Sequence, residues 1–263
     1  MDNLDSFAER ASIDHAYKGF YVDNRTSKET TQGRFSDIDD NTLHFISGKS
    51  HPLIHDVGIS NGITSVDLYR RLSADHRSFK LFVSDKFAHF YRVGTRFCRI
   101  YDRNDKLTRA YIFSIVADKN LHWKYFLSKY SYQLIRAIPY HRQHAVPIML
   151  YDPSLRLLLH EGKIFEIEYD VFNTSHPPDF DLVRCMNVLN LSYFSPAEIS
   201  KAIINLTHSL KEGGVLQIGR TTPEGLNNAS FFKKVHDQLI LVEDVNEGSE
   251  IKELTLLGWA TKD

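Results

Sequence analysis

The fold of this chain is decided by the stretch Pro52-Leu-Ile-His-Asp56-Val-Gly58-Ile-Ser60-Asn-Gly62. The apolar run Leu53–Val57 predicts a buried strand, and the glycines after it predict a turn. An amphipathic helix is expected from Ile63 onward, because apolar residues recur there at helical spacing. Ligands of open α/β sheets bind at the carboxyl ends of the strands, which is where this turn should lie.

Further strands and helices alternate along the chain after this opening unit. The apolar segment Phe79–Val83 predicts a second strand, which ends at Ser84-Asp85. The later strands are expected at Lys163–Tyr169, Phe180–Cys185 and Val215–Gly219, and the later helices at Pro196–Leu210 and Asn227–Val235. This alternation predicts a mostly parallel α/β sheet.

The C-terminal region gives a constraint on topology. Two apolar-rich segments, Gln238–Val245 and Ile251–Ala260, are separated only by residues 246–250. A parallel crossover needs a dozen or more residues, so these two segments are expected to form a hairpin. The sheet should therefore end in one antiparallel strand at its edge.

The regular alternation is interrupted between residues 86 and 162. An inserted β-hairpin is expected there, with strands at Phe90–Tyr101 and Leu107–Val116, followed by an amphipathic helix at Leu121–Ile138. Residues 1–50 are expected to form an N-terminal helical extension, and residues 51–263 the main domain. The extension should contain helices near Asn3–Tyr17 and Asp39–Ser47.

The charge of the chain is unevenly distributed. The formal net charge is −1, yet the stretch from Lys86 to Tyr151 carries twelve basic and three acidic side chains. Such segregation indicates that the insertion meets an anionic group. The basic, aromatic-rich helix Leu121–Ile138 is compatible with an anionic membrane surface, or with a cap whose apolar face packs on the core.

Composition excludes several classes of protein. No apolar stretch is long enough for a membrane-spanning helix, and the acidic start Met1-Asp-Asn-Leu-Asp lacks the apolar region of a secretory signal. Two cysteines form no disulfide framework, so a cytoplasmic protein, with membrane association left open, is expected. No cysteine and histidine cluster has zinc-ligand spacing, so we expect no metal. We do not expect nucleic acid as a partner, because the sequence contains no pattern typical of an RNA- or DNA-binding module.

The turn at residues 58–62 has three possible interpretations. A dinucleotide-binding turn requires G-x-G-x-x-G, whereas this chain reads G-x-S-x-G. A sulfonium compound carries no phosphate and needs an acid at the strand end, which Asp56 supplies. Asp85 follows the second strand 23 residues after Gly62, where a carboxylate accepts hydrogen bonds from ribose. A tight turn that binds nothing is the third interpretation.

The motif Asp56-Val-Gly58-Ile-Ser60-Asn-Gly62 resembles the first motif of class I, Rossmann-like methyltransferases, which differs only at Ser60. This resemblance implies a seven-stranded Rossmann-like sheet with an antiparallel C-terminal strand, and S-adenosyl-L-methionine as the cofactor. It also implies that Asp85 holds the ribose and that Asp170 faces the adenine, with Val171 and Phe172 beside the ring. The cofactor-binding residues implied by it are Asp56, Gly58, Ser60, Gly62, Asp85, Asp170 and Val171.

A narrower similarity covers Asp181–Phe194, which contains Cys185-Met-Asn187-Val-Leu-Asn190. This stretch resembles chemotaxis-receptor methyltransferases, whose pattern has arginine before the asparagine where this chain has Met186. From this similarity we carry over Asn187 alone, as a cofactor contact.

The residues that would catalyse methyl transfer are less evident from the pattern. The reaction depends mainly on positioning the acceptor, although an oxygen or nitrogen acceptor needs a general base as well. Candidates near strand ends are Asn190, Tyr193 and Arg220, and His141 lies in the insertion. The expected acceptor is an anionic small molecule, a saccharide or a lipid-linked compound, with residues 86–162 as its cap. A non-catalytic, regulatory protein that binds the same cofactor is the alternative, and a nicotinamide oxidoreductase is disfavoured by the turn spacing.

Overall fold

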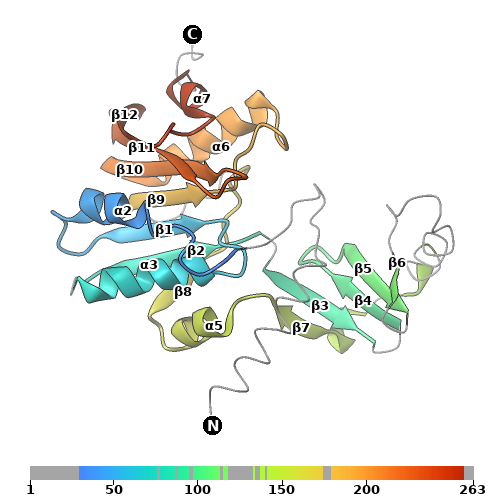
Figure 1. Ribbon diagram of the computed structural model, residues 1–263. Helices are drawn as coiled ribbons and strands as arrows, with labels where there is room; N and C mark the ends of the chain where they lie inside the picture. The colour runs from blue at the N-terminus through green and yellow to red at the C-terminus, as the bar shows by residue number, and fades with distance from the viewer. Residues whose placement is uncertain are drawn as a thin grey trace. The chain divides into compact units, whose positions relative to one another are not determined.

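The computed structural model describes residues 30–75, 78–86, 88–94, 97–112, 115–117, 133, 137–139, 141–173 and 179–257. The described residues up to Lys86 and from Tyr151 onward form one compact unit, and those between Ala88 and Leu150 form a second (Figure 1). No helix within these ranges is long and apolar enough to cross a membrane.

The first unit contains a seven-stranded sheet in the order β12-β11-β10-β9-β1-β2-β8. Its strands are β1 (Leu53–Val57), β2 (Lys80–Ser84), β8 (Ile164–Glu166), β9 (Phe180–Met186), β10 (Leu210–Thr221), β11 (Asn227–Val235) and β12 (Gln238–Val245). The pairs from β8 to β10 are parallel, and β11 is antiparallel to both of its neighbours. The prediction of a mostly parallel, seven-stranded Rossmann-like sheet is therefore confirmed.

The C-terminal hairpin lies earlier in the chain than predicted. Residues 227–235 form strand β11 and not a helix, whereas α7 (Lys252–Leu257) replaces the strand predicted at Ile251–Ala260. The hairpin joins β11 to β12 through His236 and Asp237, whose φ angles are 50° and 61°. Two left-handed residues are the geometry of a type I′ turn, but His-Asp lacks the Asn-Gly pattern by which such turns are usually identified. The strand that runs antiparallel to the others in this sheet is therefore β11, which lies next to the edge strand β12 and not at the edge as predicted.

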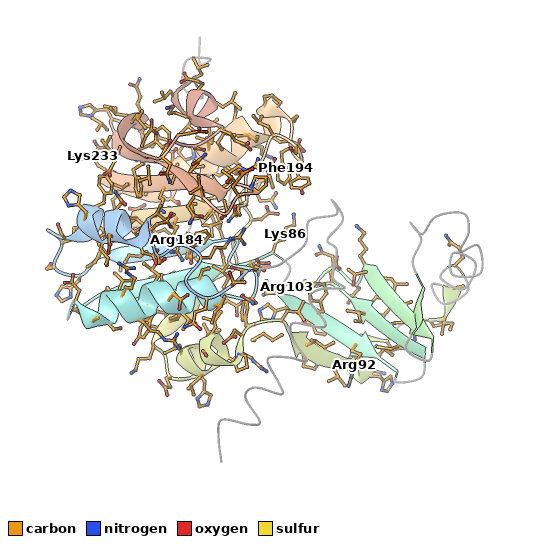
Figure 2. All side chains as sticks on the ribbon, in the orientation of Figure 1. Lys86, Arg92, Arg103, Arg184, Phe194 and Lys233 are labelled. Carbon is orange, nitrogen blue, oxygen red and sulfur yellow. The ribbon has the colours of Figure 1, made fainter. Side chains whose placement is uncertain are left out.

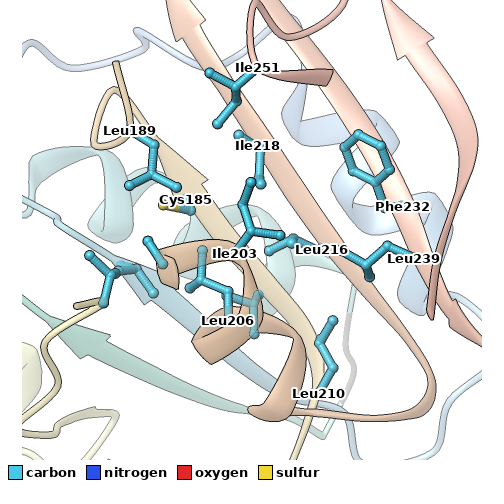
Figure 3. Packing of buried hydrophobic residues seen from close by; sticks show 14 of the residues in the cluster. Cys185, Leu189, Ile203, Leu206, Leu210, Leu216, Ile218, Phe232, Leu239 and Ile251 are labelled. Atoms are coloured by element: carbon cyan, nitrogen blue, oxygen red, sulfur yellow. The ribbon is translucent and has the colours of Figure 1, made fainter. Parts of the chain in front are cut away.

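Helices cover both faces of this sheet. On one face lie α2 (Asp39–Ile46) and α3 (Ile63–Ala74), the first of which matches the helix predicted near Asp39–Ser47. The other face packs against α6 (Pro196–His208), where Ile203 and Leu206 meet the buried side chains of β9 and β10 (Figure 3). Helix α6 begins at Pro196, where the sequence predicts it, and a capping box of Ser195 and Glu198 starts it.

Helix α5 (Pro153–His160) was not predicted. Asp152 caps it, because its side chain accepts a hydrogen bond from the backbone N–H of Ser154 at 2.7 Å. The backbone N–H of Asp152 in turn donates to the carbonyl of Asn61 at 2.8 Å, which ties the start of α5 to the turn after β1. Residues 151–162, assigned by the sequence to the insertion 86–162, thus belong to the first unit.

The second unit is a five-stranded antiparallel sheet in the order β6-β5-β4-β3-β7. It contains more strands than the hairpin predicted for the insertion. The segment Phe90–Tyr101 is divided in two at Gly94, which has a φ of 78°, the segment Leu107–Val116 is divided into β5 and β6, and β7 was not predicted. The helix predicted at Leu121–Ile138 and the one near Asn3–Tyr17 lie outside the described residues, apart from isolated positions. The strands are β3 (His89–Val93), β4 (Phe97–Tyr101), β5 (Leu107–Ile112), β6 (Ile115–Ala117) and β7 (Val146–Met149).

Candidate functional site

The turn between β1 and α3 has an alternating left-handed backbone. The φ angles of Gly58, Ser60 and Gly62 are 71°, 58° and 79°. A Cβ on Gly58 would overlap Val188, and one on Gly62 would overlap Leu155. Glycine is therefore required at both positions by φ and by packing, whereas Ser60 adopts an unfavourable conformation for a residue with a side chain.

Four of the five backbone N–H groups of this turn, all except that of Asn61, are seen to donate hydrogen bonds within the protein. Asp85, directly after β2, accepts a hydrogen bond from the Ser60 N–H through Oδ2 at 2.7 Å. The other donors and acceptors are Gly58 and Ile59 to the carbonyl of Ser84 (2.8 and 3.3 Å), Gly62 to the carbonyl of Ile59 (2.9 Å), and Ile63 to the side chain of Asn61 (3.0 Å). A phosphate at a helix N-terminus needs such N–H groups as donors, so this turn is poorly suited to a pyrophosphate.

Asp56 lies beneath the turn in a buried ionic cluster. Its carboxylate accepts two hydrogen bonds from Arg184 of β9, at 2.9 and 2.5 Å, and one from the Ser65 hydroxyl at 2.6 Å. Figure 2 labels Arg184 within the first unit. Arg184 also donates to Asp39 of α2 at 2.9 Å. The side chains of Arg184, Asp39 and Asp56 are only 0%, 2% and 5% exposed. The carboxylate of Asp56 thus joins β1, β9 and α3 from inside the fold.

Burial and charge act in opposite directions on the acids and bases of this cluster. Loss of hydration raises the pKa of Asp39 to about 6, although the positive charge of Arg184 opposes the rise. Burial alone would lower the pKa of Arg184, but the charge and hydrogen bonds of Asp56 raise it. Arg184 therefore stays protonated and holds both carboxylates.

Asp170 shapes the turn that follows β8. Its carboxylate accepts from the backbone N–H of Phe172 at 3.0 Å and from the Asn173 side chain at 3.0 Å. Lys86 forms an ion pair with it at 2.8 Å. Val171, 7% exposed, is fixed by a hydrogen bond from Asn205 of α6 to its carbonyl at 2.8 Å. Polar and apolar groups thus lie together at this turn.

Asn187 directly follows β9 and has a left-handed φ of 60°. Its side-chain oxygen accepts from the backbone N–H of Thr221 at 2.8 Å, and its own N–H donates to the carbonyl of Gly219 at 2.9 Å. Asn187 therefore ties the carboxyl end of β9 to that of β10. Val188, the next residue, is the one that packs against Gly58 of the turn.

The candidate catalytic residues lie in different environments. Asn190 is part of the loop after β9, where its side chain accepts from the Ser192 N–H at 2.7 Å. Tyr193, in the same loop, is 43% exposed. Arg220 donates to Glu250 at 2.6 Å. His141 belongs to the second unit, next to the 3-10 turn Arg142–His144.

The structure brings the turn at residues 58–62, Asp85 and the segment around Asn187 together at the carboxyl ends of β1, β2 and β9. The sequence analysis did not identify the partners of Asp56, which are Arg184 and Asp39. One signal could have indicated them, because Arg184 lies between the apolar residues Val183 and Cys185 in a fully buried strand. A charged residue in such a strand requires a buried partner of opposite charge.

Comparisons with known proteins give similarities at the level of solved structures. No family model matches the chain, and no curated protein matches its sequence. A similar structure is that of an S-adenosylmethionine-dependent methyltransferase from Clostridium acetobutylicum, with 12% identity, a TM-score of 0.44, and coverage of 95% of this chain and 87% of that one.

Two further similar structures come from other bacteria. The 1,6-didemethyltoxoflavin-N1-methyltransferase of Burkholderia thailandensis has 12% identity and a TM-score of 0.42, covering 95% of this chain and 76% of its own. An amino pentose methyltransferase from Micromonospora echinaspora has 12% identity and a TM-score of 0.37, covering 87% and 69%. All three are methyltransferases, the class that the turn motif resembles. The resemblance of Asp181–Phe194 to chemotaxis-receptor methyltransferases finds no support among them.

Proposed function

We propose that this protein binds S-adenosyl-L-methionine and transfers its methyl group to a small-molecule acceptor. The observation that carries the proposal is the turn between β1 and α3, with the carboxylate of Asp85 held beside it by the Ser60 N–H at 2.7 Å. An acid at the tip of the second strand of an α/β sheet is suited to ribose hydroxyls. A carboxylate accepts about four hydrogen bonds, so Asp85 is able to orient the turn and bind ribose together.

The hydrogen bonding of the turn favours this cofactor over a dinucleotide. The N–H groups of Gly58, Ile59, Ser60 and Gly62 all donate within the chain. A pyrophosphate would have to replace those bonds, whereas an amino acid joined to adenosine presents no phosphate to satisfy. The chemistry of these donors and acceptors thus fits a nucleoside without phosphates.

The remaining candidate residues take distinct roles in the proposal. Asp170 and Val171 would contact the adenine, and Asn187 would border the methionine part of the cofactor. Asp56 would act indirectly, because Arg184 and Ser65 occupy its carboxylate and hold the turn in place. When bound, the cofactor supplies a methyl group on a positively charged sulfur.

The acceptor is proposed to be anionic, a saccharide or lipid-linked, with the basic residues between Lys86 and Tyr151 as the reason for the anionic class. Asn190, Tyr193, Arg220 and His141 remain the candidates for orienting the acceptor or removing its proton. Arg220, bound to Glu250, is suited to positioning the loop after β9, since Glu250 also accepts from the N–H of Leu191 at 3.3 Å.

Calorimetric titration with S-adenosylmethionine, S-adenosylhomocysteine and NAD tests the cofactor. We expect binding of the first two, and a decrease of about 10- to 100-fold in their affinity in Asp85→Asn, because a charged acceptor is lost. Asparagine keeps an oxygen for the Ser60 N–H, so the turn should stay intact. The matched control is Glu161→Gln, an exposed acid after α5, which should bind normally.

Tighter binding of NAD than of S-adenosylmethionine would contradict the proposal. Formation of S-adenosylhomocysteine with a cell extract as the source of acceptor tests the transfer step itself. Binding without any such product would favour the alternative of a non-catalytic, regulatory protein.

A further inference from the structure

An open, polar surface cavity of about 650 Å³ lies at the carboxyl end of β10. Two segments far apart in the sequence form it, namely residues 31–37 before α2 and residues 221–227, which join β10 to β11. Its volume is within the range of small-molecule sites, about 300–1,000 Å³. Both segments belong to the first unit.

The cavity is connected to the proposed cofactor site by direct contacts. Thr221 lines the cavity and receives the side chain of Asn187, which donates to its hydroxyl at 3.3 Å and accepts from its N–H at 2.8 Å. Val188, the next residue, packs against Gly58 of the turn after β1. In the parallel sheet, Val57 is paired with Cys185, and Met186 with Gly219, so the ends of β1, β9 and β10 lie at one edge.

Among the described residues, the lining of the cavity consists of hydroxyl, amide and charged side chains together with glycines. The described lining residues include one cation, Arg34, and one anion, Asp37, whose charges balance. A phosphate or carboxylate entering the cavity would meet the Asp37 carboxylate as well as the Arg34 guanidinium. The lining side chains with hydrogen-bonding groups include Arg34, Ser36, Asp37, Thr221, Thr222 and Asn227.

The cavity walls are fixed by a buried amide. Asn227, 2% exposed, donates to the carbonyl of Arg34 at 2.6 Å and to the carboxylate of Asp37 at 2.7 Å. The Thr221 hydroxyl donates to Asn227 at 2.8 Å, and the Arg34 side chain donates to that hydroxyl at 3.1 Å. These bonds hold the two segments together and orient the polar groups before a ligand arrives, which lowers the entropic cost of binding.

We propose that this cavity binds the acceptor, and that the part of the acceptor within it is an uncharged, polyhydroxylated ring such as a sugar. Any anionic group of the acceptor lies outside this cavity. That the bound ring belongs to a methyl acceptor rests on the proposed function, whereas the binding of such a ring in this cavity does not. A ring with several hydroxyl groups both donates and accepts hydrogen bonds, which matches a lining that contains a carboxylate, a guanidinium, amides and hydroxyls.

Saturation-transfer NMR on the full chain tests the binding of sugars directly. The probes are the methyl glycosides of glucose, galactose and mannose, N-acetylglucosamine, and glucose 6-phosphate, each in the millimolar range. We expect at least one neutral sugar to bind, and the phosphate to give no advantage. Ser36→Tyr should abolish this binding by filling the cavity, and Asp37→Asn should weaken it about tenfold, because a charged hydrogen bond is lost.

The matched control for Ser36→Tyr is Ser73→Tyr, at an exposed position of α3, which should bind sugar normally. Binding of no sugar, binding that both cavity variants leave unchanged, or a preference for glucose 6-phosphate would overturn the proposal. Calorimetry with S-adenosylmethionine separates this proposal from the previous one. Sugar binding that Ser36→Tyr removes, in a protein without affinity for the cofactor, would support the cavity and reject the function. Cofactor binding without sugar binding would do the reverse.

Discussion

Arg184 is expected to be the most sensitive position for the stability of the first unit. The substitution Arg184→Met replaces a fully buried guanidinium with an unbranched apolar side chain that is shorter than arginine. It leaves the carboxylates of Asp39 and Asp56, which are only 2% and 5% exposed, without their cation. The Ser65 hydroxyl, at 2.6 Å from Asp56, is too weak a partner to replace it.

The magnitude follows from the cost of an unpaired buried charge. Removal of one partner from a buried ion pair typically lowers the free energy of unfolding by about 3–5 kcal/mol. Arg184 has two carboxylate partners and also donates to the carbonyl of Thr64 at 3.2 Å, so the upper part of that range applies. Cofactor binding should weaken as well, because Asp56 lies in β1 two residues before the turn at residues 58–62.

Urea unfolding followed by far-ultraviolet circular dichroism at pH 7 measures this loss. The triple variant Asp39→Asn, Asp56→Asn, Arg184→Met should recover most of the lost stability, since it leaves no buried charge. Lys163→Met is the control, because the Lys163 side chain is 54% exposed and its ion pair with Glu161 spans 3.9 Å. A loss below about 1 kcal/mol in Arg184→Met, or a triple variant no more stable than the single one, would refute the reasoning.

Two further predictions concern Asp39 and Gly62. Burial raises the pKa of Asp39 to about 6, so the folded state binds more protons than the unfolded state between about pH 4 and 6, and this carboxyl lowers stability as pH rises through that window. The free energy of unfolding of Asp39→Asn, measured in urea titrations, should therefore rise by up to about 3 kcal/mol relative to that of the unmodified protein as the pH increases from 4 to 7. A difference between the two proteins that does not change with pH would contradict this. Gly62→Ala should lower the free energy of unfolding by about 1–3 kcal/mol and weaken cofactor binding, because Gly62 is left-handed and its new Cβ would overlap the buried Leu155. Gly162→Ala is the control, because Gly162 has a φ of 65° and open space around it. It should lower the free energy of unfolding by about 1–2 kcal/mol without changing cofactor binding. Equal losses of stability and of cofactor binding in the two variants would exclude the packing argument.

The sequence alone determined the elements whose signals are local. Strand β1, the glycine turn and α3 follow from an apolar run, two glycines and helical spacing within about twenty residues, as the printed sequence shows. The start of helix α6 follows from Ser195, an N-cap residue directly before Pro196. Asp85 was placed correctly at the end of β2, because an acid directly after an apolar strand is visible without knowledge of its neighbours.

Tertiary structure decided what depends on residues far apart in the chain. Arg184 forms hydrogen bonds with Asp39 and Asp56, which lie more than one hundred residues earlier in the sequence. The sequence of its strand indicates only that a buried partner of opposite charge must exist. The turn at His236 and Asp237 is left-handed because β11 and β12 pair on both sides of it, and not because these two residue types prefer that conformation. The cavity between residues 31–37 and 221–227 exists only once Asn227 has joined them, since a single amide that bonds two distant segments leaves no periodic pattern in the sequence.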